Sequence, residues 1–554
     1  MDATTDLAEQ NARAALHRND PRSGLLDPLS AASSITPVFG SCGFWVVMAL
    51  LLFTASPCLA NGGILNFSIS DEVSDAPLIS RCELWRPDRQ RGNDEPGSRK
   101  TLMPVRKTVP AGLGFVIDRS SELALPDGNY QFRLIRGPEY RIIRGSFTLE
   151  KTSLDDHHVG LPRMVDMFSE GWVSGDAYVP ASDYSWPLRM ASEDLHLIAT
   201  DQDIPARAIP GRDPKESVDF EPAWTLFDAS IGDGLVVYGK PELDPGLLPV
   251  ERILKAKETP GVKVAIENPF AWPLPVWLAT ESVDGHFVLG DWLRLDKDVM
   301  RVRDGRPTQA LIKGDAFAVG RWAETIYHHM LECGLTIPPL AGSGDDSGKS
   351  PIGYNRIYAT VPMSDAYGDQ AIESPRAPTS SEEWWRTVWS GHSVATNGPC
   401  LRVSLGGKLP GHTFHASTGE VLQLRPELRL AVRDPVEYLD VIHNGKIFYS
   451  AKLDEFAKAG GVIPLMNIKE SGWVMIRVVT GYEGHFRAAM SAPWYVVFDG
   501  QPRVNQQSVD FFQLWLKEYE ARLRKMPDDE IARHVPHVQR ARKFWNSRAT
   551  YARP

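Results

Sequence analysis

Residues 235–266 read LVVYGKPELDPGLLPVERILKAKETPGVKVAI, and this stretch indicates the fold class. It opens and closes with short apolar runs, residues 235–238 and 262–266, which are typical of buried strands. Between them, residues 249–257 have the spacing of a helix that begins with proline, a residue tolerated at the first helical position. Because strand and helix keep alternating over residues 165–360, the sequence predicts an α/β domain with parallel strands.

Two β-rich regions flank this central part. Residues 61–163 hold short alternating strands with turn residues between them and predict an antiparallel β-sandwich. Strands return in residues 396–500, where Asn444-Gly445 between two apolar runs is a strong hairpin signal. Five regions follow: an N-terminal segment (1–60), a β-sandwich (61–163), an α/β domain (164–395), a C-terminal β-domain (396–500) and terminal helices (501–554).

Composition narrows the functional classes. The chain of 554 residues carries a net charge of -10, which argues against a nucleic-acid partner, because such proteins present a basic face. Outside the N-terminal segment the cysteines are Cys82, Cys333 and Cys400, with no CxxC spacing, so a zinc ribbon is excluded. Buried free thiols are the favoured interpretation, and a single disulfide is the alternative.

The N-terminal segment predicts export. Residues 44–55, FWVVMALLLFTA, form an apolar run that is short for a membrane-spanning helix and matches the apolar region of a signal peptide. Small residues at Cys58 and Ala60 suit cleavage after Ala60; an uncleaved anchor helix is the alternative. The protein is therefore expected in the periplasm, the cell envelope or outside the cell, with membrane contact only through this segment.

Several motifs carry a resemblance to a known family. They are GWVSGD (171–176), ASEDLH (191–196), AIENPF (265–270), the run from 320 to 344, PIGYNR (351–356) and ATNGP (395–399). Together they resemble the carbaryl-hydrolase-like (CehA/McbA) branch of the PHP superfamily of metallohydrolases. The resemblance implies a PHP-like distorted (β/α) barrel, flanked here by the two β-regions, with metals at the C-terminal ends of its strands.

The sequence departs from the family pattern at the metal ligands. In relatives an H-x-H pair follows Gly-Asp, and two such residues on one strand point the same way and reach one metal, which acidifies a bound water. Further family histidines follow Thr-Asp and a later strand. The positions where histidine is expected hold Tyr178, Pro180, Gln202 and Trp292.

Acidic residues remain around the expected site. Asp176, Asp201 and Glu267, with Asp291 as a further candidate, could together hold a hard cation such as Mg²⁺ or Ca²⁺ through oxygen. Alternatively, Asp176 is a loop or cap carboxylate and Glu267 forms a salt bridge at a strand end. No cofactor is expected, and a divalent metal is possible.

Histidines elsewhere offer few replacements for the missing ligands. His196 lies in an apolar strand and is interpreted as a core residue, whereas His286 is either a substitute ligand or part of a surface turn. No G-x-S-x-G elbow or P-loop is present.

Two hypotheses remain. In the first, the chain is a non-catalytic protein of the cell envelope with a binding or structural role, and its cleft holds a small molecule or a glycan. In the second, it is an active hydrolase of ester, amide or phosphoester bonds with a reduced carboxylate-based metal site.

Overall fold

The computed structural model describes residues 62–87, 102–105, 108–179, 186–201, 220–226, 228–294, 305–307, 315–344, 350–364 and 371–553. The expected signal or anchor segment lies outside these ranges, as do Pro180 and Gln202. Within them, no helix combines the length and the apolar character needed to span a bilayer. The described residues all belong to one unit, Leu59–Pro554.

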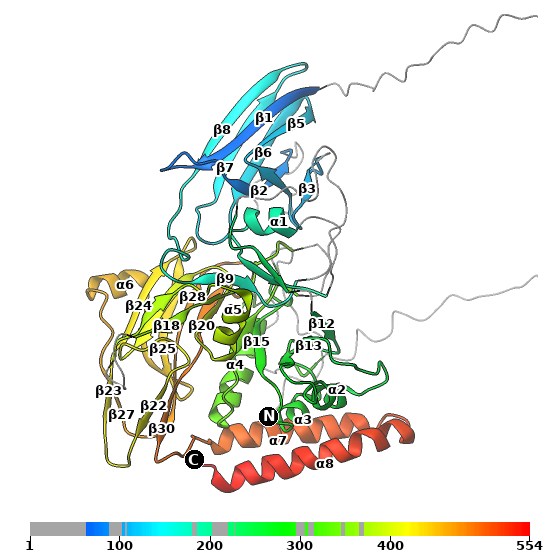
Figure 1. Cartoon of the computed structure of the whole chain (residues 1–554), viewed down its shortest axis with the longest axis vertical. Coiled ribbons are helices and arrows are strands. Elements are labelled where there is room, and N and C mark those ends of the chain that lie inside the picture. The colour runs from blue at the N-terminus through cyan, green and yellow to red at the C-terminus, as the bar shows by residue number, and fades with distance from the viewer. Residues whose placement is uncertain are drawn as a thin grey trace, which may run out of the picture. The chain divides into compact units, whose positions relative to one another are not determined.

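The N-terminal strands form two sheets that enclose a common core, coloured blue to cyan in Figure 1. One sheet has the order β5-β1-β8 and the other β3-β4-β2-β6-β7. Leu65 and Phe67 from the first sheet pack with Tyr130 and Phe132 from the second, which gives the expected sandwich-like arrangement. The strands are β1 (Gly62–Asp71), β2 (Ile79–Trp85), β3 (Val109–Pro110), β4 (Phe115–Asp118), β5 (Ser120–Pro126), β6 (Gly128–Ile135), β7 (Ile143–Leu149) and β8 (Leu154–Leu161).

One pairing in this region contradicts the prediction of an antiparallel sandwich. β8 runs parallel to β1, with Ile64 opposite Leu154 and Asp71 opposite Leu161. The chain leaves β7 in one sheet and enters β8 in the other through residues 150–153. Because the opposite edge of β1 is already occupied by the antiparallel strand β5, β8 adds to the free edge.

The central region mixes parallel and antiparallel pairs. β9 (Val173–Asp176), β10 (Leu197–Ala199) and β11 (Trp224–Leu226) run parallel, as do β14 (Lys263–Ile266), β15 (Gly285–Leu289) and β16 (Pro339–Ala341). β13 (Leu235–Tyr238), however, is antiparallel both to β12 (Ala229–Gly232) and to β14. The expectation that the strands at the two ends of residues 235–266 run parallel is therefore wrong. Tyr238 lies opposite Lys263, so the helical segment between them leaves and re-enters the sheet at the same end.

Backbone hydrogen bonds connect the two groups of central strands. Ala177 N donates to Ala341 O (3.1 Å), and Gly344 N donates to Tyr178 O (3.3 Å). On the other side, Ala229 N donates to Thr200 O (3.3 Å). The segments after β9 and β10 thus lie against both edges of the five-stranded sheet β12-β13-β14-β15-β16.

An eleven-stranded sheet joins the central region to the C-terminal β-region. Its order is β11-β10-β9-β17-β20-β29-β28-β25-β26, with β30 pairing β28 and β22. β20 hydrogen-bonds to β29, so one sheet takes strands from both sides of residue 395. The remaining strands are β17 (Arg356–Ala359), β18 (Val361–Met363), β19 (Ser374–Arg376), β20 (Ser393–Thr396), β21 (Cys400–Leu405), β22 (Thr413–Ala416), β23 (Leu422–Leu424), β24 (Pro426–Ala431), β25 (Val436–His443), β26 (Lys446–Ala451), β27 (Met466–Ile468), β28 (Gly472–Thr480), β29 (Ala488–Ser491) and β30 (Trp494–Phe498).

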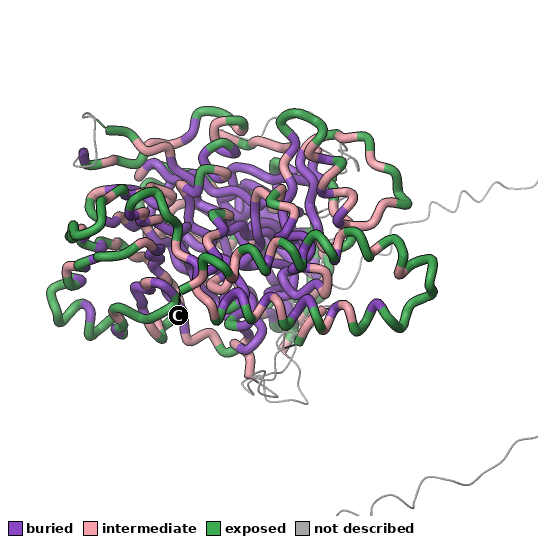
Figure 2. The backbone as a smooth tube through the Cα atoms, turned by 90° about the horizontal axis from the view of Figure 1, so that it is seen from below, coloured by how far each residue is buried: buried purple, intermediate pink, exposed green. Residues whose placement is uncertain are grey.

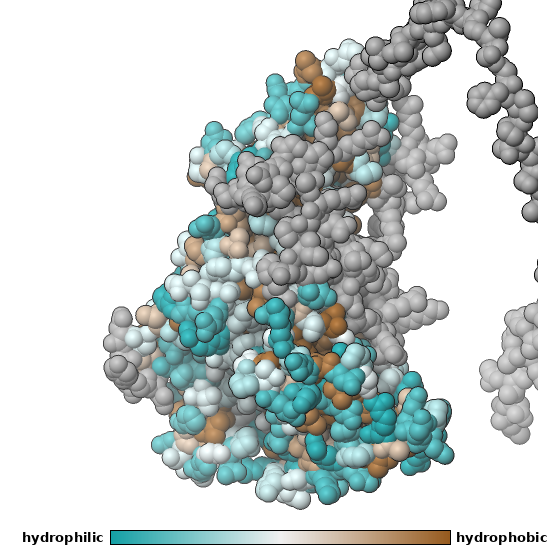
Figure 3. Space-filling model, turned by 45° about the vertical axis from the view of Figure 1, so that its right-hand side comes forward, coloured by the Kyte–Doolittle hydropathy of each residue, from teal (hydrophilic) through white to brown (hydrophobic). Residues whose placement is uncertain are grey.

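The terminal helices expected from the sequence are present, and α7 and α8 lie side by side in Figure 1. Trp545 stacks on Phe512, with 4.8 Å between ring centroids, and its indole N–H donates to Pro275 O (3.0 Å). Buried and exposed residues alternate along the two helices in Figure 2, and their region of Figure 3 is mostly hydrophilic. The described helices are α1 (Trp186–Ser192), α2 (Pro249–Ala256), α3 (Leu274–Leu278), α4 (Ala318–Glu332), α5 (Ser381–Trp389), α6 (Leu453–Lys458), α7 (Gln506–Leu523) and α8 (Asp528–Tyr551).

The cysteines follow the favoured interpretation. Cys82, Cys333 and Cys400 are buried free thiols. Burial raises the pKa of each thiol above its ordinary value, so none is predisposed to form a thiolate.

Candidate functional site

Asp176 lies at the end of β9 and is fully buried. Its Oδ1 accepts hydrogen bonds from Tyr178 N (3.2 Å) and Ser343 N (3.0 Å). Its Oδ2 accepts from Ser343 Oγ (2.5 Å) and Gly353 N (2.7 Å). Burial raises the pKa of Asp176 to about 7, although these donors favour the ionised form and oppose the rise. The carboxylate therefore ties β9 to two segments that lie more than 160 residues further along the chain.

Two tyrosines occupy the space beside this carboxylate. Tyr178, which stands at an expected ligand position, is 1% exposed and packs in the main core. Tyr238, at the end of β13, donates its phenolic hydrogen to Ala177 O (2.9 Å). Burial raises the pKa of Tyr238 well above its ordinary value, and the charges of Asp176, Tyr178 and Glu267 raise it further. The fold thus brings the carboxyl groups of Asp176 and Glu267 within electrostatic range of one phenol.

Glu267 follows β14 and is fully buried. Its backbone N–H donates to Gly234 O (2.8 Å), which fixes the chain where it leaves the strand. Asp201, in contrast, follows β10 and is exposed. The structure therefore places these acidic residues in different environments.

Asp291 and Trp292 follow β15 and are both buried. Trp292 packs edge-on against Phe270, with 5.3 Å between ring centroids, so it fills core volume at a position expected from the sequence to hold a ligand. The Cβ of Asp291 lies against Gly344, where an added Cβ would meet it at 1.9 Å. Only a glycine fits at that point, and the segment after Ser343 is packed tightly onto Asp291.

The candidate ligands are not brought together as a metal-binding cluster in the described part of the chain. Within the described ranges, no group of three or more His, Cys, Asp or Glu side chains is arranged to hold a metal ion. The oxygens of Asp176 are engaged by protein N–H and O–H groups, and Tyr178 and Trp292 act as core side chains. Pro180 and Gln202 lie outside the described residues.

His196 and His286, the two histidines weighed in the sequence analysis, are both buried. His196 lies between the rings of Phe168 and Phe220, with centroids 5.2 and 4.9 Å away, and its Nδ1 is 2.9 Å from Ser174 Oγ. His286 stacks on Tyr327 at 5.7 Å, on the buried strand β15. Burial lowers the pKa of His196 to about 4 and that of His286 to about 3, so both rings are neutral at pH 7. His286 is a core residue and is not part of a surface turn.

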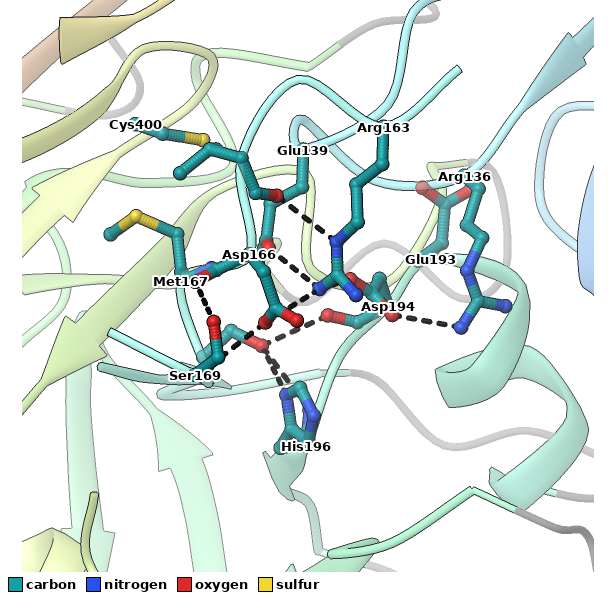
Figure 4. A network of polar contacts seen from close by, with 12 residues as sticks. Arg136, Glu139, Arg163, Asp166, Met167, Ser169, Glu193, Asp194, His196 and Cys400 are labelled. Atoms are coloured by element: carbon teal, nitrogen blue, oxygen red, sulfur yellow. Dashed lines mark hydrogen bonds and ion pairs between the residues drawn. The ribbon is translucent and has the colours of Figure 1, made fainter. Parts of the chain in front are cut away.

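A buried ionic network lies next to His196 and was not found from the sequence (Figure 4). The guanidinium of Arg163 binds both Glu139 Oε2 (3.0 Å) and Asp194 Oδ2 (3.3 Å), and Arg136 binds Asp194 Oδ1 (2.8 Å). Burial and the charge of Asp194 raise the pKa of Glu139. Burial alone would raise the pKa of Asp194, but Arg136 and Arg163 outweigh it and hold that pKa below its ordinary value.

The network connects regions that are distant in sequence. Tyr358 on β17 donates to Glu139 Oε1 (3.0 Å), and Glu139 also accepts from Met167 N (2.9 Å). Asp194 belongs to the ASEDLH motif, so the motif itself was a usable signal. Its partners Arg136, Glu139 and Arg163 stand outside any motif, which is why the sequence did not reveal them.

The chain matches no protein-family model, no curated protein and no solved structure.

Proposed function

We propose that the chain is an exported, non-catalytic protein on a PHP-like scaffold, with a binding or structural role in the cell envelope. The backbone hydrogen bonds that link the segments after β9 and β10 to the edges of the β12–β16 sheet are compatible with a distorted barrel. In such a barrel, Asp176 at the end of β9 and Asp201, Glu267 and Asp291 just after their strands stand where PHP-like proteins would carry ligands.

One observation carries the non-catalytic proposal. Both oxygens of Asp176 accept two hydrogen bonds each from the protein itself, including one from the hydroxyl of Ser343. A carboxylate that binds a cation needs lone pairs directed at the ion, whereas here the donors surround it. Asp176 thus has the contacts of a structural residue.

A second candidate function is an active hydrolase of ester, amide or phosphoester bonds. It is favoured by the closeness of Asp176 and Glu267 to the same phenol, since both charges act on the pKa of Tyr238. A metal that displaced the proton of Tyr238 or Tyr178 would find two carboxylates near it. This alternative requires Asp176 to exchange its present donors for the ion.

Metal analysis of the purified full chain tests the choice. After growth with Zn²⁺, Mn²⁺ and Fe²⁺, we expect far less than one ion per chain and no hydrolysis of nitrophenyl esters or phosphoesters. Glu267→Gln should then resemble the wild type in metal content. One tightly bound ion that Glu267→Gln loses and the exposed control Glu258→Gln retains, together with metal-dependent hydrolysis, would establish the second function instead.

Export has its own test. N-terminal sequencing of protein recovered from the cell envelope should begin at Asn61 if the signal is cleaved after Ala60. An intact N-terminus on membrane-bound protein would identify an anchor, and protein found only in the cytosol would contradict export.

A further inference from the structure

A cavity of about 630 Å³ lies among the sandwich strands, the segment before β17 and two turns of the C-terminal β-region. This volume is within the range of small-molecule sites. The charged residues among its described lining are six arginines and three acids: Arg81, Arg133, Arg144, Arg356, Arg433, Arg487, Glu83, Glu193 and Asp434. The lining therefore carries three positive charges in excess, in a chain whose net charge is -10.

On one side of the cavity, two carboxylates pair with two of the three arginines. Arg81 is ion-paired with Glu83 (2.5 Å) and Glu193, and Arg133 also binds Glu83, with its Nε 2.8 Å from Oε2. Arg356 contacts backbone carbonyl groups instead, with its Nε 2.6 Å from Gly353 O. These contacts hold the wall of the cavity. One of the three excess charges remains here with Arg356, and the other two belong to Arg144, Arg433 and Arg487, which have only Asp434 to offset them.

The other part of the lining holds Arg433 and Arg487, and the charge of Asp434 acts on both. Arg487 is 5% exposed, donates to Asp434 Oδ2 (2.6 Å) and to Tyr354 Oη (3.1 Å), and lies 3.7 Å above the centroid of the Tyr482 ring. Arg487 Nε and Arg433 Nη1 are buried and have no hydrogen-bond partner among the described residues. Burial and the neighbouring charge of Arg487 lower the pKa of Arg433 to about 10, which leaves it charged at pH 7.

The uncompensated positive charge of this lining calls for an anion, because Asp434 can offset only one of Arg433 and Arg487. Buried charges are normally paired, because leaving one unpaired is costly. The planar fork of arginine matches the oxygens of phosphate in two-point contacts, and Tyr354 and Tyr482 add aromatic surface to the lining of the cavity. Three excess charges suit a phosphomonoester dianion better than a single carboxylate.

We propose that this cavity binds a phosphorylated small molecule, with its phosphate held by Arg433 and Arg487 and its organic part against Tyr482. Arg144, exposed at the rim on β7, adds to the field that attracts the anion. This inference does not depend on whether the chain catalyses hydrolysis, because the cavity is formed by other residues than Glu267 and Asp176.

Calorimetric titration of the full chain with phenyl phosphate and with inorganic phosphate tests the proposal. We expect both to bind and to raise the melting temperature, phenyl phosphate more tightly, and binding to weaken with salt. Phenol, which lacks the charge, should not bind. Absence of binding by both phosphates, or tighter binding of the tricarboxylate citrate than of phenyl phosphate, would overturn the proposal.

Charge variants locate the site. Arg433→Gln should weaken phenyl phosphate binding about tenfold or more. Asp434→Asn should strengthen it, because it removes the carboxylate that competes for Arg487. Arg386→Gln, on the exposed face of α5, is the matched control and should bind as the wild type does.

Arg144→Gln provides a variant whose folding is not in question, because this side chain is exposed. It should weaken binding a few-fold and reduce its salt dependence. Equal affinity in Arg144→Gln, Arg386→Gln and the wild type, or weaker binding in Asp434→Asn, would show that the anion binds elsewhere.

Discussion

Replacing Asp176 by asparagine should destabilise the chain even when no metal is present. Asparagine keeps the shape but presents only one acceptor oxygen. If that oxygen takes the position of Oδ1, the bonds from Tyr178 N and Ser343 N survive. The new NH₂ group then faces the N–H of Gly353, whose nitrogen lies 2.7 Å from Oδ2. One buried N–H loses its partner, which costs about 1–3 kcal/mol.

The effect should depend on pH in a definite direction. Burial raises the pKa of Asp176 from an ordinary value of 3.8 to about 7. Between these values the native carboxyl group keeps a proton that the unfolded chain releases, so the wild type loses stability as the pH rises. Asparagine has no such dependence. The difference in unfolding free energy between the wild type and the variant should therefore be larger at pH 5 than at pH 8.

Urea unfolding in EDTA, followed by tryptophan fluorescence, measures the difference. Asp201→Asn is the matched control: Asp201 is exposed, so its loss should change the unfolding free energy by less than about 0.5 kcal/mol. If Asp176 were instead a metal ligand, its replacement would leave the metal-free protein unchanged or more stable. Equal stability of Asp176→Asn and Asp201→Asn at both pH values would refute the structural role.

Three further substitutions test the packing. His286→Phe should raise the melting temperature, and more at pH 5 than at pH 7.5. Below pH 6.5 the histidine of the unfolded chain takes up a proton that the buried ring does not. This difference lowers the unfolding free energy of the wild type by about 2 kcal/mol at pH 5. An equal gain at both pH values would contradict this reasoning. Gly175→Ala should destabilise by about 1–3 kcal/mol, because the new Cβ would lie 2.3 Å from the ring of Trp384; an unchanged urea midpoint would refute it. Trp545→Ala should lose about 3–5 kcal/mol in urea unfolding and release α8 from α3, visible as faster hydrogen exchange in α8. Unchanged exchange there would show that α8 is held by other contacts.

Local signals in the sequence were sufficient for individual elements. Ser380 caps α5, with its Oγ accepting from Glu383 N (3.1 Å), and Asn444 and Gly445 adopt positive φ values of 51° and 70° in the expected hairpin. Each of these depends on residues within a few positions of one another. Helix caps and tight turns are therefore readable from sequence, because their physics is local.

Strand direction and the site itself depend on distant residues. The apolar run 235–238 identifies a buried strand, but its composition is the same whichever way its neighbour runs, so the antiparallel β13–β14 pair was missed. Tyr238 fills the space beside Asp176 only because β13 ends opposite Ala177. Arg433 and Arg487 approach each other from separate turns, and no spacing in the sequence marks that meeting.

The pairing of β20 with β29 determines when the eleven-stranded sheet can form during synthesis. β20 ends at Thr396, and its partner β29 begins at Ala488, so about 90 residues must be added before the pair can form. A ribosome adding about 5–20 residues per second needs roughly 5–20 s for this. Throughout that interval β20 offers an unsatisfied edge to any other nascent chain. The period of greatest aggregation risk therefore falls late in translation, when a chaperone that shields strand edges would benefit the yield most.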